Sequence, residues 1–137
     1  MNRYDLQDLA LIRCREARVL LENGNYEGSY YLCGYVVEYG LKACIAKETR
    51  RYDFPYKEIV NASYTHDLTR LVKTAALEPD MDKELKSNPD FADNWYTVKD
   101  WSEKSRYEKH TDKEAQDLYS AVADGKQGVL QWIKRHW

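Results

Sequence analysis

The sequence predicts an all-α fold, an antiparallel up-and-down bundle of four to five helices. Only three prolines and six glycines interrupt the 137 residues, and no run of alternating residues has the length and β-branched composition of a strand. Apolar residues instead recur at three- and four-residue steps, as they do on one face of a helix. A chain of this length can bury one hydrophobic core, so we expect a single domain over residues 1–137.

The first helix is expected from about Asp5 to Glu22. Its apolar positions fall near the spacing of a single stripe: Leu6, Leu9, Ile12, Ala17, Leu20 and Leu21. The tripeptide Asn-Gly-Asn at 23–25 should end this helix, because Gly24 suits the position after a helix and Asn25 can cap the next one.

The second helix, from Tyr26 to about Glu48, is the most apolar part of the chain. Gly34 and Gly40 inside it each cost roughly 1 kcal/mol relative to alanine, so we expect them to allow the close approach of another helix. Glu38 interrupts the apolar face, and Lys42 lies one turn later in the orientation that favours an ion pair.

Shorter helices should follow. A polar and aromatic connector is expected over residues 49–63, and then a helix from near Thr65. Prolines that suit a first helical turn predict helices over 79–87 and 89–101, the second with Asn88 as its cap.

The last helix should be long. Thr111 and Glu114 have the spacing of a capping box, in which each side chain satisfies a backbone N–H at the helix start. From there the helical pattern continues through Ile133, so His110 is expected just outside the helix.

The charge and cysteine content restrict the classes of function. Lys and Arg number 21 against 23 Asp and Glu, so the chain has no basic surplus with which to grip a long nucleic acid unaided. Arginines divide the apolar residues of the first 21 positions, which excludes a signal peptide or membrane span there and makes the cytoplasm the expected location. Three cysteines without a CxxC pair predict reduced thiols.

No cofactor or metal is expected. The sequence has no Gly-rich phosphate loop, no pair of catalytic carboxylates and no cluster of metal ligands.

Three segments carry a resemblance to a known family. The segment CREARVLLENGNYEGSYYLCGYVVEYGLKACI (14–45) resembles the opening helical hairpin of HEPN domains, including its Val-Glu and Leu-Lys-Ala positions, here Val37-Glu38 and Leu41-Lys42-Ala43. The segments THDLTRL (65–71) and WSEKSRY (101–107) resemble the family's His-Asp-Leu helix start and its Trp…Arg-Tyr segment. The resemblance extends from Asp5 to about Trp132.

This resemblance implies a helical bundle that usually dimerises, and two branches of activity. One branch comprises metal-independent ribonucleases, often toxins of toxin–antitoxin systems, whose genes in many cases lie beside that of a minimal nucleotidyltransferase. The other branch binds nucleotides or acts as an accessory module.

Arg106 and His110 are the candidate catalytic residues. The nuclease branch has an arginine, four to six residues and a histidine, with a polar residue after the arginine. Histidine can take the proton of a ribose 2′-hydroxyl, and arginine can clamp the phosphate. Here only three residues intervene, and Tyr107 replaces the polar residue. The alternative is structural: Arg106 and Tyr107 hold the connector to the bundle while His110 is solvated.

Other candidates are weaker. Arg51 and Tyr52 could neutralise and stack on a phosphorylated base, and with Arg106 and Tyr107 they form the candidate nucleotide- or RNA-binding set. A charged loop, however, needs no ligand. His66 is expected to bond the connector, and His136 to fray at the C-terminus.

Three functions therefore stay open. The first is a homodimeric module that binds a nucleotide or RNA, or docks a nucleotidyltransferase, without strong catalysis. The second is a metal-independent endoribonuclease toxin that uses Arg106 and His110. The third is a scaffold for dimerisation alone.

Overall fold

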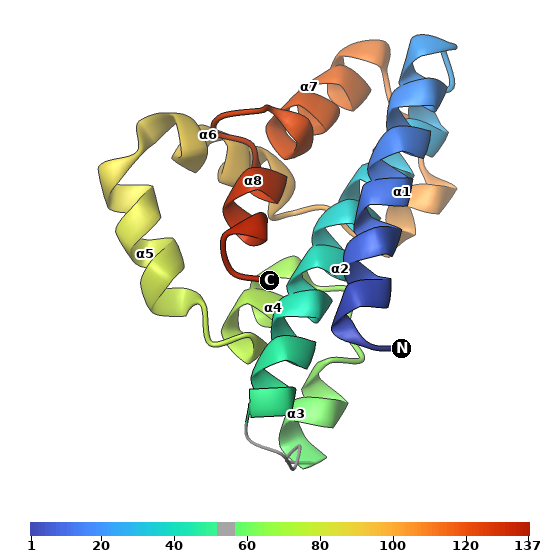
Figure 1. Ribbon diagram of the computed structural model, residues 1–137. Coiled ribbons are helices and arrows are strands. Elements are labelled where there is room, and N and C mark those ends of the chain that lie inside the picture. Colours follow the sequence, from blue (N-terminus) through green and yellow to red (C-terminus); the bar gives the residue numbers. More distant parts are fainter. Residues whose placement is uncertain (52–56) are drawn as a thin grey trace.

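The computed structural model describes residues 1–51 and 57–137, apart from the side chains of Arg50 and Arg51. The described residues are all helical or irregular, without a strand, which confirms the predicted fold class. They contain eight α-helices and one 3₁₀-helix, more than the four or five expected. In chain order these are α1 (Arg3–Glu22), α2 (Tyr26–Arg51), α3 (Lys57–Ala62), α4 (Leu68–Thr74), α5 (Glu78–Ser87), α6 (Pro89–Val98), η1 (Glu103–Tyr107), α7 (Asp112–Ala123) and α8 (Val129–Lys134) (Figure 1).

The two long helices, α1 and α2, form an antiparallel hairpin and lie side by side in Figure 1. A capping box starts α1, because Asn2 accepts from the Asp5 N–H and Asp5 accepts from the Asn2 N–H, both at 3.0 Å. Gly24 has φ +77°, a left-handed conformation that glycine adopts without steric cost, and it follows the end of α1. Ser29 of α2 donates to the Ala17 carbonyl of α1 at 2.8 Å, so the two helices pack closely.

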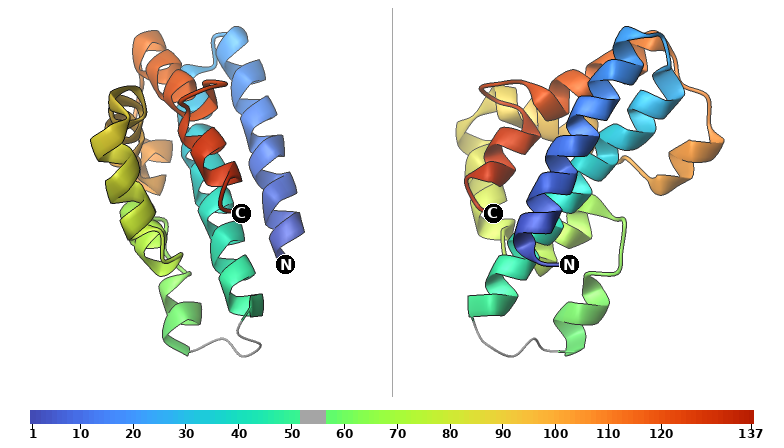
Figure 2. Two further views of the ribbon diagram at one scale, coloured as in Figure 1. Left: turned by 60° about the vertical axis from the view of Figure 1, so that its left-hand side comes forward. Right: turned by 45° about the vertical axis from the view of Figure 1, so that its right-hand side comes forward.

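Helix α2 is the centre of the fold. Besides α1 it contacts α4, η1, α7 and α8, and Figure 2 shows these elements gathered around it from two further sides. The core includes Leu41 of α2, Phe91 of α6 and Trp132 of α8, all buried. The last two rings pack with centroids 5.5 Å apart.

The glycines inside α2 do allow close contact. A Cβ at Gly40 would lie 2.9 Å from Ile133 Cγ2 of α8, so the prediction of helix approach is confirmed there. At Gly34 the neighbour is a single side chain, the indole of Trp101, which follows α6 and would overlap an added Cβ. Trp101 is only 4% exposed, and Gly34 therefore provides the space in which it sits.

Several predicted helix boundaries are wrong. Helix α2 continues to Arg51 and α3 occupies Lys57–Ala62, so the described parts of the expected connector 49–63 are mostly helical. Helix α4 starts at Leu68 because Asp67 is the cap and accepts from the Arg70 N–H at 3.1 Å. Helix α6 ends at Val98, although Asn88 caps it as predicted.

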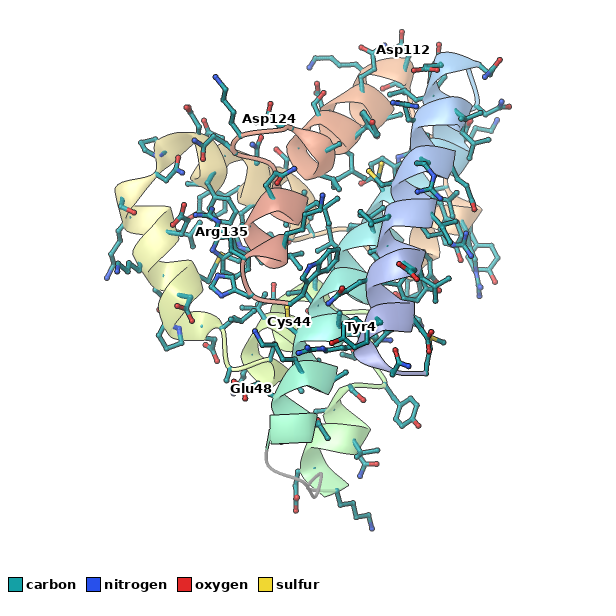
Figure 3. All side chains as sticks on the ribbon, viewed as in Figure 1. Tyr4, Cys44, Glu48, Asp112, Asp124 and Arg135 are labelled. Carbon is teal, nitrogen blue, oxygen red and sulfur yellow. The ribbon has the colours of Figure 1, made fainter. Side chains whose placement is uncertain are left out.

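The prediction of one long last helix is also wrong, because this part of the chain forms two helices, α7 and α8. The Asp124 side chain accepts from the backbone N–H groups of Lys126 and Gln127, which turns the chain out of the helix. A Cβ at Gly128 would lie 2.5 Å from the Asp124 carbonyl oxygen, so the tight turn depends on that glycine. In Figure 3 the labels Asp112 and Asp124 mark the two ends of α7.

Candidate functional site

The exposed 3₁₀-helix η1 carries Arg106 and Tyr107. In the right-hand view of Figure 2 the orange segment that contains it projects beside α2. The Arg106 guanidinium lies over the Tyr107 ring, 4.7 Å from its centroid, and Tyr107 is 78% exposed. No described carboxylate lies within ion-pair distance of Arg106. The arrangement presents an uncompensated cation and an aromatic ring to solvent.

A row of partly exposed tyrosines on α2 lies beside this pair. Tyr31, Tyr35 and Tyr39 follow each other at four-residue steps, so they share one face of the helix. Tyr31 donates to the Tyr35 hydroxyl at 3.2 Å. Electrostatic attraction and hydrogen bonding by Tyr107, and hydrogen bonding by Tyr31, raise the pKa of Arg106, and η1 packs against α2.

His110 is enclosed by its neighbours. The structural alternative, in which this histidine is solvated, is therefore wrong on this point. Its ring stacks on Tyr30 with centroids 3.7 Å apart, and its side chain is 6% exposed. Nδ1 lies 3.0 Å from Glu114 Oε2, and Nε2, for which the described residues provide no hydrogen-bond partner, lies 3.6 Å from Glu108 Oε2. The hydrogen bond to His110 lowers the pKa of Glu114.

The hydrogen bond between His110 and Glu114 changes the predicted capping box. Thr111 Oγ1 accepts from the Glu114 N–H at 3.1 Å as expected. The Glu114 carboxylate, however, bonds the His110 ring and the Thr111 hydroxyl. Glu114 therefore fixes the histidine at the start of α7.

Arg106 and His110 have different neighbours. Arg106 lies beside Tyr31, and His110 stacks on Tyr30; consecutive residues of an α-helix point about 100° apart. No hydrogen bond joins the two candidate residues in the described part of the chain. Of the other two binding candidates, the side chain of Arg51 and the whole of Tyr52 lie outside the described residues.

A buried polar cluster lies farther along α2. Glu38 is 2% exposed; its Oε2 accepts from Lys42 Nζ at 3.2 Å, the predicted ion pair. Its Oε1 lies 2.7 Å from His66 Nδ1. His66 was expected to bond the connector and instead bonds α2. A buried carboxylate is costly unless paired and hydrogen-bonded, so both partners stabilise this arrangement.

A cavity of about 390 Å³ opens beside His66. Its walls come from the start of α4 and from the segment that joins α6 to η1. The lining residues are Thr65, His66, Asp67, Thr69, Lys99, Asp100, Trp101, Ser102 and Glu103. The indole Nε1 of Trp101, which is buried, has no hydrogen-bond partner among the described residues. An unsatisfied buried donor is uncommon and calls for an explanation, such as a bound water or ligand.

The Tyr35 ring connects these parts. It packs against Trp101 at 5.2 Å, His66 at 5.9 Å and Tyr39 at 5.8 Å between centroids. Glu38, His66 and Arg106 belong to the three segments on which the family resemblance rests, so segments far apart in sequence meet on one face of α2. The cluster itself was missed by sequence reasoning, although the Val-Glu and His-Asp-Leu motifs already contained its members.

A larger cavity, of about 620 Å³, lies near the C-terminal end of α2. Tyr4, Cys44, Glu48 and Arg135, labelled in Figure 3, are among its lining residues. His136 also lines it and packs on Trp132 at 4.7 Å between centroids, where fraying was expected. Burial raises the pKa of the Cys33 and Cys44 thiols to about 12, so neither is a thiolate at neutral pH.

The described residues contain neither a candidate metal cluster nor a candidate membrane span. No group of three or more His, Cys, Asp or Glu side chains there is placed to hold a metal ion. None of the helices described is at once long and apolar enough to cross a membrane.

Comparison with known proteins identifies the family. Neither a curated protein nor a solved structure shows a significant match. A family model described as the HEPN domain matches residues 5–136, nearly the whole chain, and its helical fold agrees with the structure. The chain therefore belongs to the HEPN domain family.

Proposed function

We propose that this HEPN domain binds the phosphate of a nucleotide or of an RNA end through Arg106, without strong catalysis of its own. One observation carries the proposal: Arg106 is exposed, lacks a carboxylate partner among the described residues and lies over the ring of Tyr107, which is 78% exposed.

The chemistry of the pair matches such a ligand. A guanidinium donates two parallel hydrogen bonds to phosphate oxygens, and an exposed aromatic ring is a platform for a base. Lys104 and Lys109, both exposed, flank the pair. With Arg106 they outnumber Glu103 and Glu108, so residues 103–109 have a formal charge of +1 in a chain whose formal charge is −2. A small basic patch on an acidic protein favours a short ligand over a long nucleic acid.

The surroundings of His110 favour binding over catalysis. A general base must reach the proton that it abstracts. The His110 side chain is 6% exposed, stacked on Tyr30 and bonded through Nδ1 to Glu114. A substrate reaches this ring only after the Tyr30 stack or the contacts with the two carboxylates have opened.

Calorimetric titration in EDTA tests the binding proposal, with ATP and a short single-stranded RNA as ligands. We expect Arg106→Gln and Tyr107→Ala to lower the affinity at least tenfold. Arg18→Gln is the matched control, because Arg18 is an exposed arginine of α1. The proposal fails if the wild type binds neither ligand, or if Arg106→Gln binds as tightly as the control.

A metal-independent ribonuclease is the second candidate. The observation that favours it is the Nε2 atom of His110, only four residues after Arg106, which is buried and has no hydrogen-bond partner in the part of the chain that the structure describes. RNA cleavage in EDTA that both Arg106→Ala and His110→Ala abolish would support it. Intact RNA at high concentrations of the wild type would exclude this activity and leave the binding proposal standing.

We also propose the homodimer and the nucleotidyltransferase partner that the family resemblance implies, in a toxin–antitoxin-like context and in the cytoplasm. The membership in the family supports these proposals. Light scattering of the purified chain tests the dimer, and a monomer at all concentrations would refute it.

A further inference from the structure

We propose that the 390 Å³ cavity beside His66 is a subsite for the ribose hydroxyls of the ligand, and that it makes the domain select ribonucleotides over deoxyribonucleotides. The inference rests on the proposed function, since it assumes a phosphate at Arg106, and it names the class of ligand more narrowly. Three features support it: the cavity is lined by hydrogen-bond acceptors, it contains a histidine of fixed tautomer, and a ligand bound there could extend to Arg106.

The hydrogen bond with Glu38 fixes the tautomer of His66. An ionised carboxylate can only accept, so the proton of the 2.7 Å contact belongs to His66 Nδ1. In the neutral ring Nε2 then carries the lone pair. The His66 side chain is 43% exposed and lines the cavity, so this nitrogen is an acceptor available to a ligand.

The environment of Glu38 keeps its carboxylate oriented toward His66. It is almost fully buried, and Lys42 Nζ occupies its second oxygen at 3.2 Å. The carboxylate therefore cannot turn away without leaving a buried charge unpaired. Glu38 is a positioning residue, because it acts on a ligand only through the imidazole.

The rest of the cavity is also rich in acceptors. Asp67, Asp100 and Glu103 line it, against one cation, Lys99. Lys99 is paired with Asp100 at 3.2 Å, and Glu103 accepts from the Ser102 hydroxyl at 3.3 Å. Carboxylates accept several hydrogen bonds each. Such walls repel a phosphate and attract hydroxyl groups, and a carboxylate is a common partner of a ribose 2′-hydroxyl.

The inference needs the cavity and Arg106 to lie within reach of one ligand. Helix η1, which carries Arg106, packs against α2, and on α2 two ring-to-ring steps lead from Tyr31 to His66, 5.1 Å to Tyr35 and 5.9 Å onward. The opposite charges at the two ends orient the ligand, with the phosphate toward Arg106 and the sugar toward His66. The 2′-hydroxyl is the group that separates RNA from DNA at such a site.

Titration of ATP and 2′-deoxy-ATP at about pH 8, above the ordinary titration range of imidazole, tests the subsite. One hydrogen bond to the 2′-hydroxyl should make ATP bind about tenfold more tightly. We expect His66→Ala to reduce this preference to less than about threefold. His136→Ala is the control, because this partly buried histidine lines the 620 Å³ cavity and not the one beside His66.

The Glu38→Gln variant tests the positioning role. Because the amide oxygen should remain toward the Lys42 ammonium, the NH₂ group would face His66 Nδ1 and move the ring proton to Nε2. Imidazole ¹⁵N shifts should report protonated Nδ1 in the wild type and protonated Nε2 in the variant, with loss of the preference for ATP. A protonated Nε2 in the neutral wild-type ring would overturn the inference even if the variant does not fold.

The outcomes separate this inference from the proposed function. Equal binding of ATP and 2′-deoxy-ATP, with an affinity that still depends on Arg106, overturns the ribose subsite and leaves phosphate binding intact. Binding of neither nucleotide overturns both.

Discussion

Gly34→Ala is the sharpest test of the packing that builds the site. In most helices this change stabilises by about 1 kcal/mol, because alanine is the better helix former. Here the added methyl group would overlap the Trp101 indole, which is 4% exposed. Because the overlap is with the ring itself, the indole must leave its site, and loss of a buried tryptophan from its site costs about 3–5 kcal/mol. We expect a net loss of about 2–4 kcal/mol after the gain in helix propensity is subtracted.

Urea unfolding followed by circular dichroism measures this loss. With a slope of about 2 kcal/mol per molar urea, the midpoint should fall by roughly 1–2 M. Gly28→Ala is the matched control, because it lies in the same helix and its Cβ would meet the end of the flexible Leu20 side chain, with Cδ1 at 3.3 Å and Cδ2 at 3.9 Å. The reasoning is refuted if Gly34→Ala is as stable as the wild type, or if both alanine variants gain stability equally.

Three further predictions follow from individual residues. Ala76 has φ +60° at the end of α4, where Leu77 and Ala76 donate to the Val72 and Lys73 carbonyls in the pattern that usually contains glycine. Ala76→Gly should therefore stabilise by about 1 kcal/mol in urea unfolding, and a loss of stability would contradict this account. Lys42→Met should destabilise by about 3 kcal/mol, because it leaves the buried Glu38 carboxylate without its lysine partner; a change below about 1 kcal/mol would show that this ion pair is not structural. Burial lowers the pKa of His136 in the folded state below 6.5, so the unfolded chain binds more protons below that pH and stability should fall as the pH is lowered from about 7. His136→Asn should flatten this part of the thermal-unfolding profile, and an unchanged profile would rule out His136 as its source.

Much of the fold could be predicted from local sequence alone. The apolar stripes of α1 and α2, the break at Gly24 and the cap at Asn88 depend on residues within a few positions of each other. The same local logic failed at the end of the chain. The Asp124 side chain competes there with the helix for backbone N–H groups, and an apolar pattern that continues to Ile133 does not reveal this competition.

The sequence by itself determined the helical class, the family and the presence of an Arg-Tyr pair close to a histidine, because periodicity and motif order are properties of the chain. Only the tertiary structure decided what those residues contact. His110 is covered by Tyr30, while His66, 28 positions from Glu38, is fixed by that buried carboxylate. Packing brings together residues that sequence spacing separates, and the burial of Glu38 makes its pairing obligatory.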